Sequence, residues 1–301
     1  MSKVFLNLDP EVRSALAGNK PIVALESTVI AHGLPRPQNL ETALRLEQIV
    51  KEAGAVPATI AILEGRLLAG LSDEQIRFVA LSEEIKKVSI RDLPIAIAQQ
   101  WNGATTVAST TWIAYRAGIS VFATGGIGGI HRGSDKDISA DLPALANSSL
   151  VVVCSGAKIV LDLAATREWL ETYGITIVGY QCDEMPAFYS RHSGLPVDIR
   201  TDCPEDVATI FRAQQELALE RALLVTVPVP EEFEVPSESL ERTLDEAMQE
   251  AASRRVGGRE LTPFLLSRMA QASEGATLKA NIALLENNAR VAAQIAAALT
   301  E

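Results

Sequence analysis

The chain has 301 residues, 48% of them hydrophobic, which is enough for a substantial buried core in one large domain or two smaller ones. Its 27 lysines and arginines against 38 aspartates and glutamates give a net charge of −11, which argues against broad binding to a nucleic-acid backbone or an anionic membrane surface. Three widely spaced cysteines without a CxxC pair argue against a disulfide framework and a zinc site, and favour a reduced cytoplasm.

The N-terminal part of the chain predicts a strand followed by a helix. It lacks the apolar core of a signal peptide, and nowhere does the sequence reach the ~18 apolar residues of a membrane span. Residues 21–25 are continuously apolar and predict a buried strand that ends at Glu26. Asn39 is expected to cap the next helix, whose apolar residues follow helical spacing until Gly54 ends it.

The alternation of strands and helices continues through the middle of the chain. Residues 56–63 predict a strand, and Ser72 with Gln75 three residues later predicts a capping box at the start of a helix. Residues 106–117 predict another helix, with Gly118 as its end. The remaining predicted strands are 119–123, 150–154, 175–180 and 222–227, with helices near 157–173 and 204–221. Such alternation predicts an α/β fold with a largely parallel sheet.

The pattern changes to helices alone in the C-terminal part. Ser237 is expected to cap one helix, Thr262-Pro263 to open a second with proline at its first position, and residues 278–299 to form a last amphipathic helix. No break in composition and no flexible linker separates domains. We therefore expect one domain over residues 1–301, with a helical C-terminal elaboration.

A lysine follows the most apolar predicted strand. The run VVVC at 151–154 is typical of a strand buried on both faces, and Ser155-Gly156-Ala157 then leads to Lys158 near an expected strand-to-helix junction, where open α/β sheets bind ligands. A partly desolvated amine near a helix N-terminus loses some preference for its proton and can attack a carbonyl group. A lysine that lies along a solvated helix is an equally good interpretation of this segment alone.

Residues 123–133, ATGGIGGIHRG, form a glycine-rich segment after a predicted strand. Glycines let backbone N–H groups approach an anion, and His131 and Arg132 add donors and charge, so the segment is a candidate phosphate site. It lacks the Lys-Ser/Thr of a P-loop and the GxGxxG spacing. The alternative is a sharp loop whose glycines serve only to allow positive φ.

Three carboxylates are candidates for acid–base or metal chemistry. If residues 137–141 begin a helix, Asp137 and Asp141 lie on one face, and without cysteine or clustered histidine they favour a hard ion such as Mg²⁺ or Mn²⁺. The alternative is a helix N-terminus rich in acids that suit its dipole. Glu26 is expected at the end of the sheet, where burial would raise its pKa toward that of a usable acid, unless it is salt-bridged there.

Two further groups of polar residues carry a weaker signal. The segment 87–92, KVSIRD, brings Lys87, a hydroxyl and an ion-pair partner into a short extended piece, although solvated surface charge explains it as well. His32 and His192 lie in predicted loops without supporting spacing, so we expect both to be surface or structural residues. Aromatic residues are few, and none forms a stacking platform for single-stranded nucleic acid.

Taken together, eight sequence blocks resemble the pseudouridine-5′-phosphate glycosidases, also called pseudouridylate synthases or indigoidine synthase A-like proteins. The blocks are ALEST at 24–28, GAVPATIAI at 54–62, NGATTVAST at 102–110, FATGGIGGIHRG at 122–133, DISADL at 137–142, SGAK at 155–158, TPFLL at 262–266 and LKANIALLENNA at 278–289. They follow the family order from about residue 20 to the C-terminus. One departure is the segment 134–136, which is shorter than in relatives.

The resemblance implies reversible cleavage of the C–C glycosidic bond of pseudouridine 5′-phosphate to uracil and ribose 5-phosphate. It also implies a homotrimeric, cytoplasmic α/β/α protein with a mixed, largely parallel central sheet and a divalent cation, usually Mn²⁺ and otherwise one such as Mg²⁺. Lys158 is similar to the family's Schiff-base lysine, Glu26 to its proton donor and Asp137 to its metal ligand. Positions similar to substrate contacts are Lys87, Val107, Ser139, Ala140, Asp141 and Asn281, and we expect His131 to join them.

The chemistry of a C-glycoside explains this choice of residues. Its scissile bond has no heteroatom to protonate, so the two carboxylates of an ordinary glycosidase do not suffice. An iminium between Lys158 and C1′ of the ring-opened ribose would make the sugar carbon an electron sink, and Glu26 would supply protons. Two alternatives stay open: a Schiff-base aldolase or lyase acting on another phosphosugar, and a non-catalytic sensor of a sugar phosphate or nucleotide.

Overall fold

The computed structural model describes residues 6–133, 137–254, 256 and 261–300, so the short segment 134–136 lies outside the described residues. The strands are β1 (Leu6–Leu8), β2 (Ile22–Leu25), β3 (Val56–Leu63), β4 (Arg66–Ala69), β5 (Lys86–Val88), β6 (Gly103–Thr105), β7 (Val121–Ala123), β8 (Ile130–His131), β9 (Val151–Cys154), β10 (Leu161–Asp162), β11 (Thr176–Tyr180), β12 (Ile199–Thr201) and β13 (Leu223–Thr226).

The helices include all of those predicted, in the predicted order, and additional short ones that local patterns did not predict. They are α1 (Pro10–Ala17), α2 (Gln38–Glu52), α3 (Asp73–Leu81), α4 (Leu93–Ala98), α5 (Val107–Ala117), α6 (Asp141–Leu145), α7 (Leu163–Thr172), α8 (Pro204–Glu216), α9 (Ser237–Ser253), α10 (Leu261–Ala272) and α11 (Ala276–Thr300), with a π-helical turn η1 (Val29–Gly33) and 3₁₀ turns η2 (Ile90–Asp92) and η3 (Glu231–Phe233). None of those in the described part of the chain combines the length and the apolar character that a membrane crossing requires.

The central sheet is largely parallel, as the alternation of elements predicts, and it is mixed, as the family resemblance implies. Its strand order is β1-β4-β3-β2-β7-β9-β13-β11-β12, and β5 and β6 join it beside β3. Neighbours from β3 to β12 in this order run parallel, whereas β4 and β6 lie antiparallel to β3. Leu25 of β2 pairs with Ala123 of β7, which pairs with Val153 of β9. The residues that follow these three strands therefore leave the sheet side by side.

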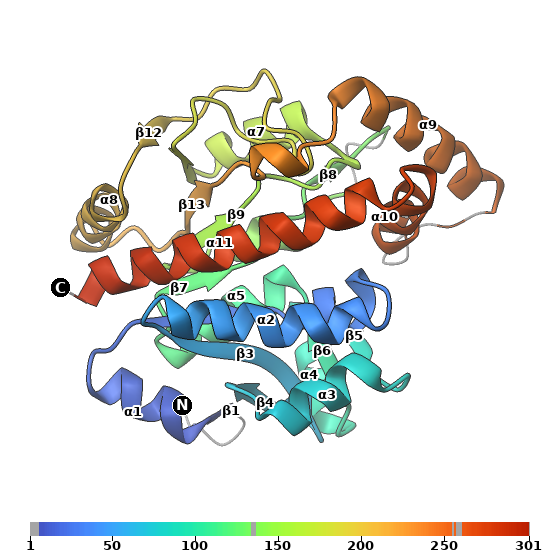
Figure 1. Cartoon of the computed structure of the whole chain (residues 1–301). Helices are drawn as coiled ribbons and strands as arrows, with labels where there is room; N and C mark the ends of the chain where they lie inside the picture. Colours follow the sequence, from blue (N-terminus) through green and yellow to red (C-terminus); the bar gives the residue numbers. More distant parts are fainter. Residues whose placement is uncertain (1–5, 134–136, 255, 257–260, 301) are drawn as a thin grey trace.

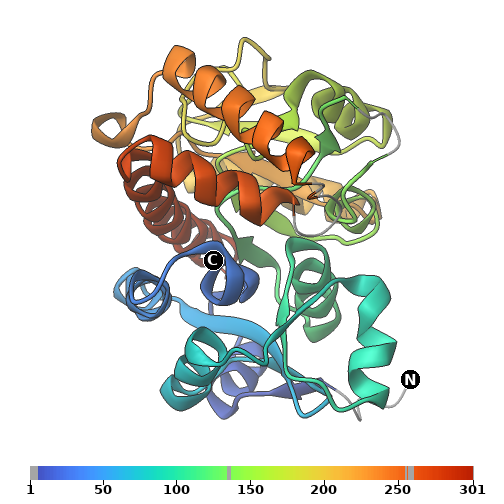
Figure 2. The ribbon, with the colours of Figure 1, turned by 90° about the vertical axis from the view of Figure 1, so that its right-hand side faces the viewer.

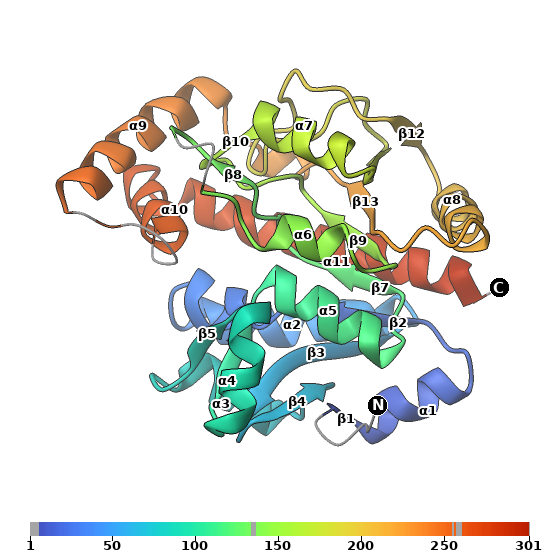
Figure 3. The same cartoon turned by 180° about the vertical axis from the view of Figure 1, so that it is seen from behind.

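Helices cover both faces of the sheet and make a three-layer α/β/α structure. On one face α2 and α11 pack against each other, over β2, β3, β7 and β9 (Figure 1). On the other face α5 and α6 pack together (Figure 3). Because both faces are covered, the four residues of β9 are fully buried, as their continuous apolar run predicts. The helices α9 and α10 pack together at the end of the molecule that faces the viewer in Figure 2.

Some helix ends are as predicted. The hydroxyl of Ser72 accepts a hydrogen bond from the backbone N–H of Gln75, and the side chain of Gln75 accepts one from the N–H of Ser72, which completes the capping box. Gly118 ends α5 with a φ of 85°, a left-handed conformation that glycine adopts without steric cost. Residues 278–299 lie within α11 as predicted, whereas Pro263 is not the first residue of α10, because Leu261 and Thr262 already belong to that helix.

Two predicted caps are wrong. Asn39 lies inside α2, not before it, and its amide donates to the carbonyl oxygens of Ile30, at 2.8 Å, and Ala80, at 2.7 Å. Its buried side chain thus supplies hydrogen bonds to backbone carbonyl groups of two segments packed beside α2, a role that helical spacing does not reveal. The helix α9 begins at Ser237 itself, with Pro236 in the cap position.

Candidate active site

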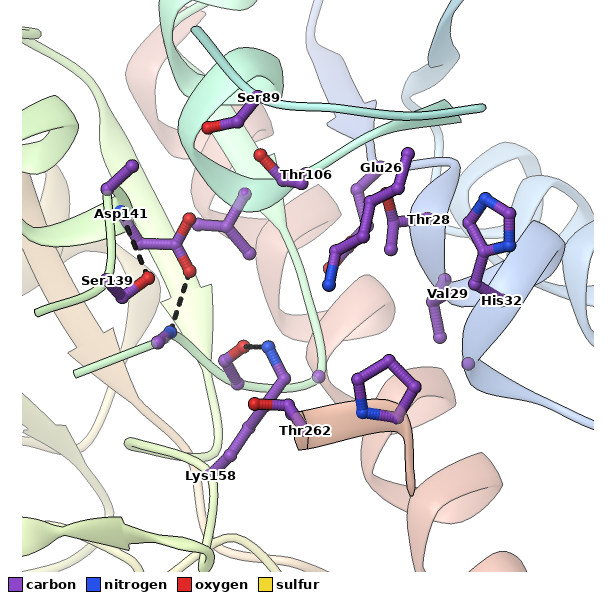
Figure 4. Close-up of a pocket in the computed structure, with 18 of the residues that line it drawn as sticks. Glu26, Thr28, Val29, His32, Ser89, Thr106, Ser139, Asp141, Lys158 and Thr262 are labelled. Carbon is purple, nitrogen blue, oxygen red and sulfur yellow. Dashed lines mark hydrogen bonds between the residues drawn. The ribbon is translucent and has the colours of Figure 1, made fainter. Parts of the chain in front are cut away.

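A cavity of about 410 Å³ lies at the carboxyl ends of the parallel strands, a size within the range of roughly 300–1,000 Å³ typical of small-molecule sites. The residues expected to act in catalysis, substrate binding or metal binding on the basis of the family resemblance line it: Glu26, Lys87, Val107, His131, Asp137, Ser139, Ala140, Asp141, Lys158 and Asn281. Figure 4 shows three groups around the cavity: Glu26, Thr28 and His32 on one side, Ser139 and Asp141 on the other, and Lys158 with Thr262 below. The tertiary structure brings these distant segments to one place.

Lys158 extends its side chain into this cavity from a loop, not from a helix. The helix predicted near 157–173 begins only at Leu163, because the residues after β9 pair with the loop after β7. The N–H of Ile127 donates to the carbonyl of Gly156 at 3.0 Å, and the N–H of Lys158 donates to the carbonyl of Ile127 at 3.1 Å. The half-buried amine donates to the carbonyl of Gly126 at 2.8 Å (Figure 4). Backbone pairing between two loops, and not a helix N-terminus, holds this amine.

Glu26 follows β2 directly and is 9% exposed. The hydroxyl of Thr124, the residue after the adjacent strand β7, donates to its carboxylate. Burial raises the pKa of Glu26 above its ordinary value, and this effect outweighs the opposing influence of Lys158, of the Thr124 hydrogen bond and of Lys87. The raised pKa confirms the sequence-based expectation and is what a proton donor requires.

Asp141 joins two segments of the cavity wall. One carboxylate oxygen accepts from the N–H of Ala108 in the first turn of α5, and the other accepts from the N–H of Gly128, both at 2.8 Å. Its own N–H donates to the hydroxyl of Ser139 at 3.2 Å. Since α6 begins at Asp141, the expectation that Asp137 and Asp141 share a helical face is wrong.

The glycine-rich loop is built for close approach of protein groups. A Cβ at Gly128 would lie 2.2 Å from the hydroxyl oxygen of Ser139, so only glycine fits against the 139–141 segment. The N–H of Gly128 is taken by Asp141, and the guanidinium of Arg132 donates to the carbonyls of Leu161 and Ile159 and does not line the cavity. The Gly128 N–H and the Arg132 guanidinium therefore bond to other parts of the protein, whereas the sequence predicted that they would contact an anion.

Asp141→Asn is expected to lower the free energy of unfolding by about 2 kcal/mol or more, because an amide accepts only one of the two buried N–H groups and turns its own NH₂ toward the other. Urea unfolding of the variant checks this expectation. The matched control is Asp162→Asn, since Asp162 accepts one N–H, from Ala165, at the N-cap of α7, where asparagine serves equally well. Equal stability of the two variants would contradict the joining role of Asp141.

Asp137 suits a hydrated hard cation. Its side chain is exposed in the wall of the cavity, and its backbone carbonyl accepts from the N–H of His131 at 3.0 Å. Within residues 6–133, 137–254, 256 and 261–300, no three His, Cys, Asp or Glu side chains gather in a way that could hold a metal ion. One carboxylate with water and substrate oxygens fits Mg²⁺ or Mn²⁺, which keep several waters, better than zinc.

The two lysines of β5 point to opposite sides of the strand. Lys87 lines the cavity, whereas the ammonium of Lys86 lies 3.8 Å from the centre of the Trp101 ring. This follows from the alternation of side chains along a strand. Val107 is the first residue of α5, and Asn281 is a buried residue of α11.

The cavity wall also includes residues that were not expected there, among them His32 and Phe188. His32 belongs to the π-helical turn η1, which follows Glu26 closely, and it lines the cavity, whereas His192 has a side chain 75% exposed to solvent as expected. Phe188 lies in the irregular loop after β11 with a φ of 64°, an outlier for a bulky residue. Its N–H donates to the carbonyl of Ser155 at 3.0 Å, so its place depends on a distant segment that no local pattern reveals.

The sequence and the fold are both similar to known proteins. The family model described as indigoidine synthase A like protein matches residues 11–298. A pseudouridine-5′-phosphate glycosidase from Caldanaerobacter subterraneus subsp. tengcongensis is 50% identical over 299 residues, covering 99% of this chain and 97% of that protein. A pseudouridine-5′-phosphate glycosidase from Petrotoga mobilis is 48% identical over 294 residues, covering 97% of this chain and 96% of that protein.

Two solved structures share the fold. An indigoidine synthase A-like protein from Thermotoga maritima superimposes with a TM-score of 0.92 at 41% sequence identity, covering 100% of this chain and 98% of that one. The prealnumycin C-glycosynthase AlnA, whose structure contains ribulose 5-phosphate, superimposes with a TM-score of 0.91 at 40% identity, covering 98% of this chain and 97% of that one. Both matches extend over nearly the whole length of each chain.

Proposed function

This chain belongs to the indigoidine synthase A-like family, and on that premise we propose that it reversibly cleaves the C–C glycosidic bond of pseudouridine 5′-phosphate to give uracil and ribose 5-phosphate. One observation carries the proposal. In a chain half identical to proteins named pseudouridine-5′-phosphate glycosidase, the amine of Lys158 and the buried carboxyl of Glu26 enter one cavity from the ends of β9 and β2, the two strands that flank β7. A nucleophile and a proton donor held together are what a carbon-linked glycoside requires.

In the proposed route, Lys158 acts as the nucleophile. Its amine, as the free base, adds to C1′ of the ring-opened sugar and loses a proton. The electron pair of the C1′–C5 bond then leaves with the pyrimidine, whose C5 takes up a proton, and C1′ becomes an iminium carbon bound to Lys158. Water hydrolyses the iminium to the aldehyde of ribose 5-phosphate and returns the amine. The hydrogen bond from Lys158 to the carbonyl of Gly126 orients the nitrogen for this addition.

Glu26 supplies the protons in the same route. Ring opening breaks the bond between C1′ and the ring oxygen, and that oxygen needs a proton as it departs; C5 of the pyrimidine needs another. A buried carboxyl with a raised pKa is suited to hold and release a proton at these atoms. The hydrogen bond from Thr124 fixes the direction in which the carboxyl points.

The rest of the cavity wall would bind the substrate. We assign Lys87 and His131 to the negative charge of the phosphate or of the uracil oxygens, and Asn281 to the uracil side. Val107, Ser139 and Ala140 complete this wall, and the joining role of Asp141 keeps them in place. We further propose that residues 1–301 form a single domain and that the protein is a cytoplasmic homotrimer, for which sedimentation equilibrium is the direct test of subunit number.

Asp137 would hold the divalent cation, Mn²⁺ or another such as Mg²⁺, which supplies positive charge that neutralises and orients the anionic substrate. A chelator is therefore expected to lower turnover, and added Mn²⁺ to restore it. Asp137→Asn should raise the Mn²⁺ concentration for half-maximal activity by about 10-fold or more, because one of the few protein ligands loses its charge. The matched control is Asp73→Asn on the exposed start of α3, and an equal metal requirement in both variants would refute the assignment.

The test of the proposed reaction is product analysis. Incubation with pseudouridine 5′-phosphate is expected to yield uracil and ribose 5-phosphate in equal amounts, and the reverse incubation should yield the nucleotide. Uridine 5′-phosphate, an N-glycoside of the same shape, tests whether the carbon linkage is required. No conversion of pseudouridine 5′-phosphate, or aldol cleavage of a phosphosugar alone, would overturn the proposal and favour the aldolase or sensor alternatives.

A second candidate function is C-glycoside synthesis with an acceptor other than uracil, favoured by the similarity to the prealnumycin C-glycosynthase. The same lysine would form the same iminium with a pentose 5-phosphate, and a different carbon nucleophile would attack it. Competition decides between the two candidates. Uracil should suppress capture of ribose 5-phosphate by other acceptors if uracil is the true partner, and should have no effect if it is not.

A further inference from the structure

One fully buried amide lies between the loop after β7, whose Thr124 holds the carboxyl of Glu26, and the loop after β9, which carries Lys158. Asn288 is 0% exposed and belongs to α11, the helix that crosses the sheet over β7 and β9 (Figure 1). Its helical neighbours Leu284, Leu285 and Ala292 are buried apolar residues. A polar side chain in such surroundings must be hydrogen-bonded to offset the cost of removing it from water.

The contacts of Asn288 are with the backbone of one loop and a side chain of the other. Its NH₂ group donates to the carbonyl of Thr124 at 2.9 Å and lies 3.4 Å from the carbonyl of Gly125. The hydroxyl of Ser155 lies within hydrogen-bond distance of both ends of the amide, 3.1 Å from the nitrogen and 3.3 Å from the oxygen. A direct backbone bond, from the N–H of Ser155 to the carbonyl of Gly125 at 2.8 Å, closes the arrangement.

Each loop leads to one of the reacting groups. Thr124, held by Asn288 through its carbonyl, donates its hydroxyl to the carboxylate of Glu26. Ser155, held through its hydroxyl, opens the segment that reaches Lys158 three residues later, and Lys158 returns to the first loop by donating to Gly126. The same amide therefore supports both the acid and the amine.

We propose that Asn288 is a positioning residue that sets the distance between the carboxyl of Glu26 and the amine of Lys158 in the reaction assigned above, on which this inference rests. Asn288 does not line the described cavity, so it acts through Thr124 and Ser155 and not by contact with substrate. Asparagine suits this place because its amide offers two donors and an acceptor without a charge that would perturb its titratable neighbours.

The test compares kcat, KM and pH profiles of full-length variants. Asn288→Ala is expected to lower kcat about 10²-fold, the loss that a misplacement of about 1 Å produces, with KM changed far less. The high-pH limb, on which activity is lost as Glu26 gives up its proton, should move to higher pH, because the carboxylate loses a well-placed hydrogen bond from Thr124 while its charged neighbours Lys158, Lys87 and Asp141 are retained. Ile295→Ala, which empties a buried site two turns further along α11, is the stability control.

A second variant, Ser155→Ala, tests the contact of Asn288 with Ser155 separately from its contact with Thr124. Ser155→Ala removes the contact on the Lys158 side alone, so it should slow borohydride trapping of ribose 5-phosphate while leaving the high-pH limb that reports Glu26 in place. It also decides the matter if Asn288→Ala does not fold: wild-type trapping and kcat in Ser155→Ala would overturn the inference. So would an Asn288→Ala enzyme that matches Ile295→Ala in kcat and pH profile. A wild type that neither turns over nor traps the sugar overturns the proposed function itself.

Discussion

Lys158→Met is expected to lower kcat by on the order of 10⁴-fold or more, because methionine keeps the length and the apolar stem of the side chain and removes the nitrogen that would bond to C1′. The same change should abolish the covalent adduct that borohydride fixes on incubation with ribose 5-phosphate. Intact-mass measurement detects the adduct, and peptide mapping places it. Stability should change little, since the amine is half-buried and makes one hydrogen bond to the carbonyl of Gly126.

The chain offers two matched controls for this experiment. Lys87 reaches the same cavity, so Lys87→Met tests whether any pocket amine can form the adduct; we expect it to weaken substrate binding while the adduct persists. Lys86 lies against Trp101 on the opposite side of the strand, so Lys86→Met should match the wild type in both assays. If the adduct formed in Lys158→Met but not in Lys87→Met, the nucleophile would be Lys87 and not Lys158.

Glu26→Gln is expected to have opposite effects on activity and stability. Turnover should fall about 10²–10⁴-fold, because the amide cannot donate the protons that ring opening and uracil departure require. The free energy of unfolding at neutral pH should rise by roughly 0.5–2 kcal/mol, the usual size of a single stabilising substitution, because the variant no longer buries an ionisable carboxyl. Calorimetry and urea unfolding measure the second effect.

The stability gain has a definite pH dependence. The folded-state pKa of Glu26 is raised above its ordinary value of 4.5, so the folded protein binds this proton more tightly than the unfolded chain does. Below about pH 4.5 the carboxyl is protonated in both states, and the wild type carries no penalty. The penalty grows as the pH rises from there to the folded-state pKa and is constant above it. The advantage of Glu26→Gln should therefore be larger at pH 8 than at pH 4.

A second buried glutamate, Glu47, provides a control that distinguishes the effect of burying a carboxyl from the effect of losing a catalytic acid. Glu47 on α2 is 6% exposed, accepts a hydrogen bond from the hydroxyl of Thr59 at 2.7 Å, and has a pKa that burial raises. It does not line the cavity. Glu47→Gln should show a similar gain in stability with the same sign of pH dependence, and unchanged kcat. If both variants lost activity equally, the loss would be a consequence of disturbed packing and not of a missing acid.

Local patterns predicted the elements whose stability is decided by near neighbours. The strand Val56–Leu63 begins and ends where the apolar run does, and the capping box joins Ser72 to Gln75 three residues away. Burial of β9 also follows from its composition, because a continuous apolar run needs cover on both faces. The proposed roles of Lys158 and Glu26 came from their resemblance to a family, supported by the simple fact that each follows a buried strand.

What local patterns missed depends on contacts between distant segments. The loop that carries Lys158 takes the place of the first residues of a predicted helix because it pairs with Ile127, some 30 residues earlier. Asn39 serves two carbonyls of other segments where a cap was expected. Phe188 reaches the cavity from an irregular loop through its bond to Ser155, again a partner far away in sequence.

By itself, then, the sequence determined the order of the principal strands and helices, the buried strands and the polar groups at their ends, since these depend on side-chain period and on interactions within a turn or two. Only the tertiary structure decided which polar groups meet. Asp141 holds Ala108 and Gly128, and Asn288 holds Thr124 and Ser155, because parallel strands and a long C-terminal helix bring together residues separated by up to 164 positions. A hydrogen bond forms wherever the fold places donor and acceptor, and no periodicity records that placement.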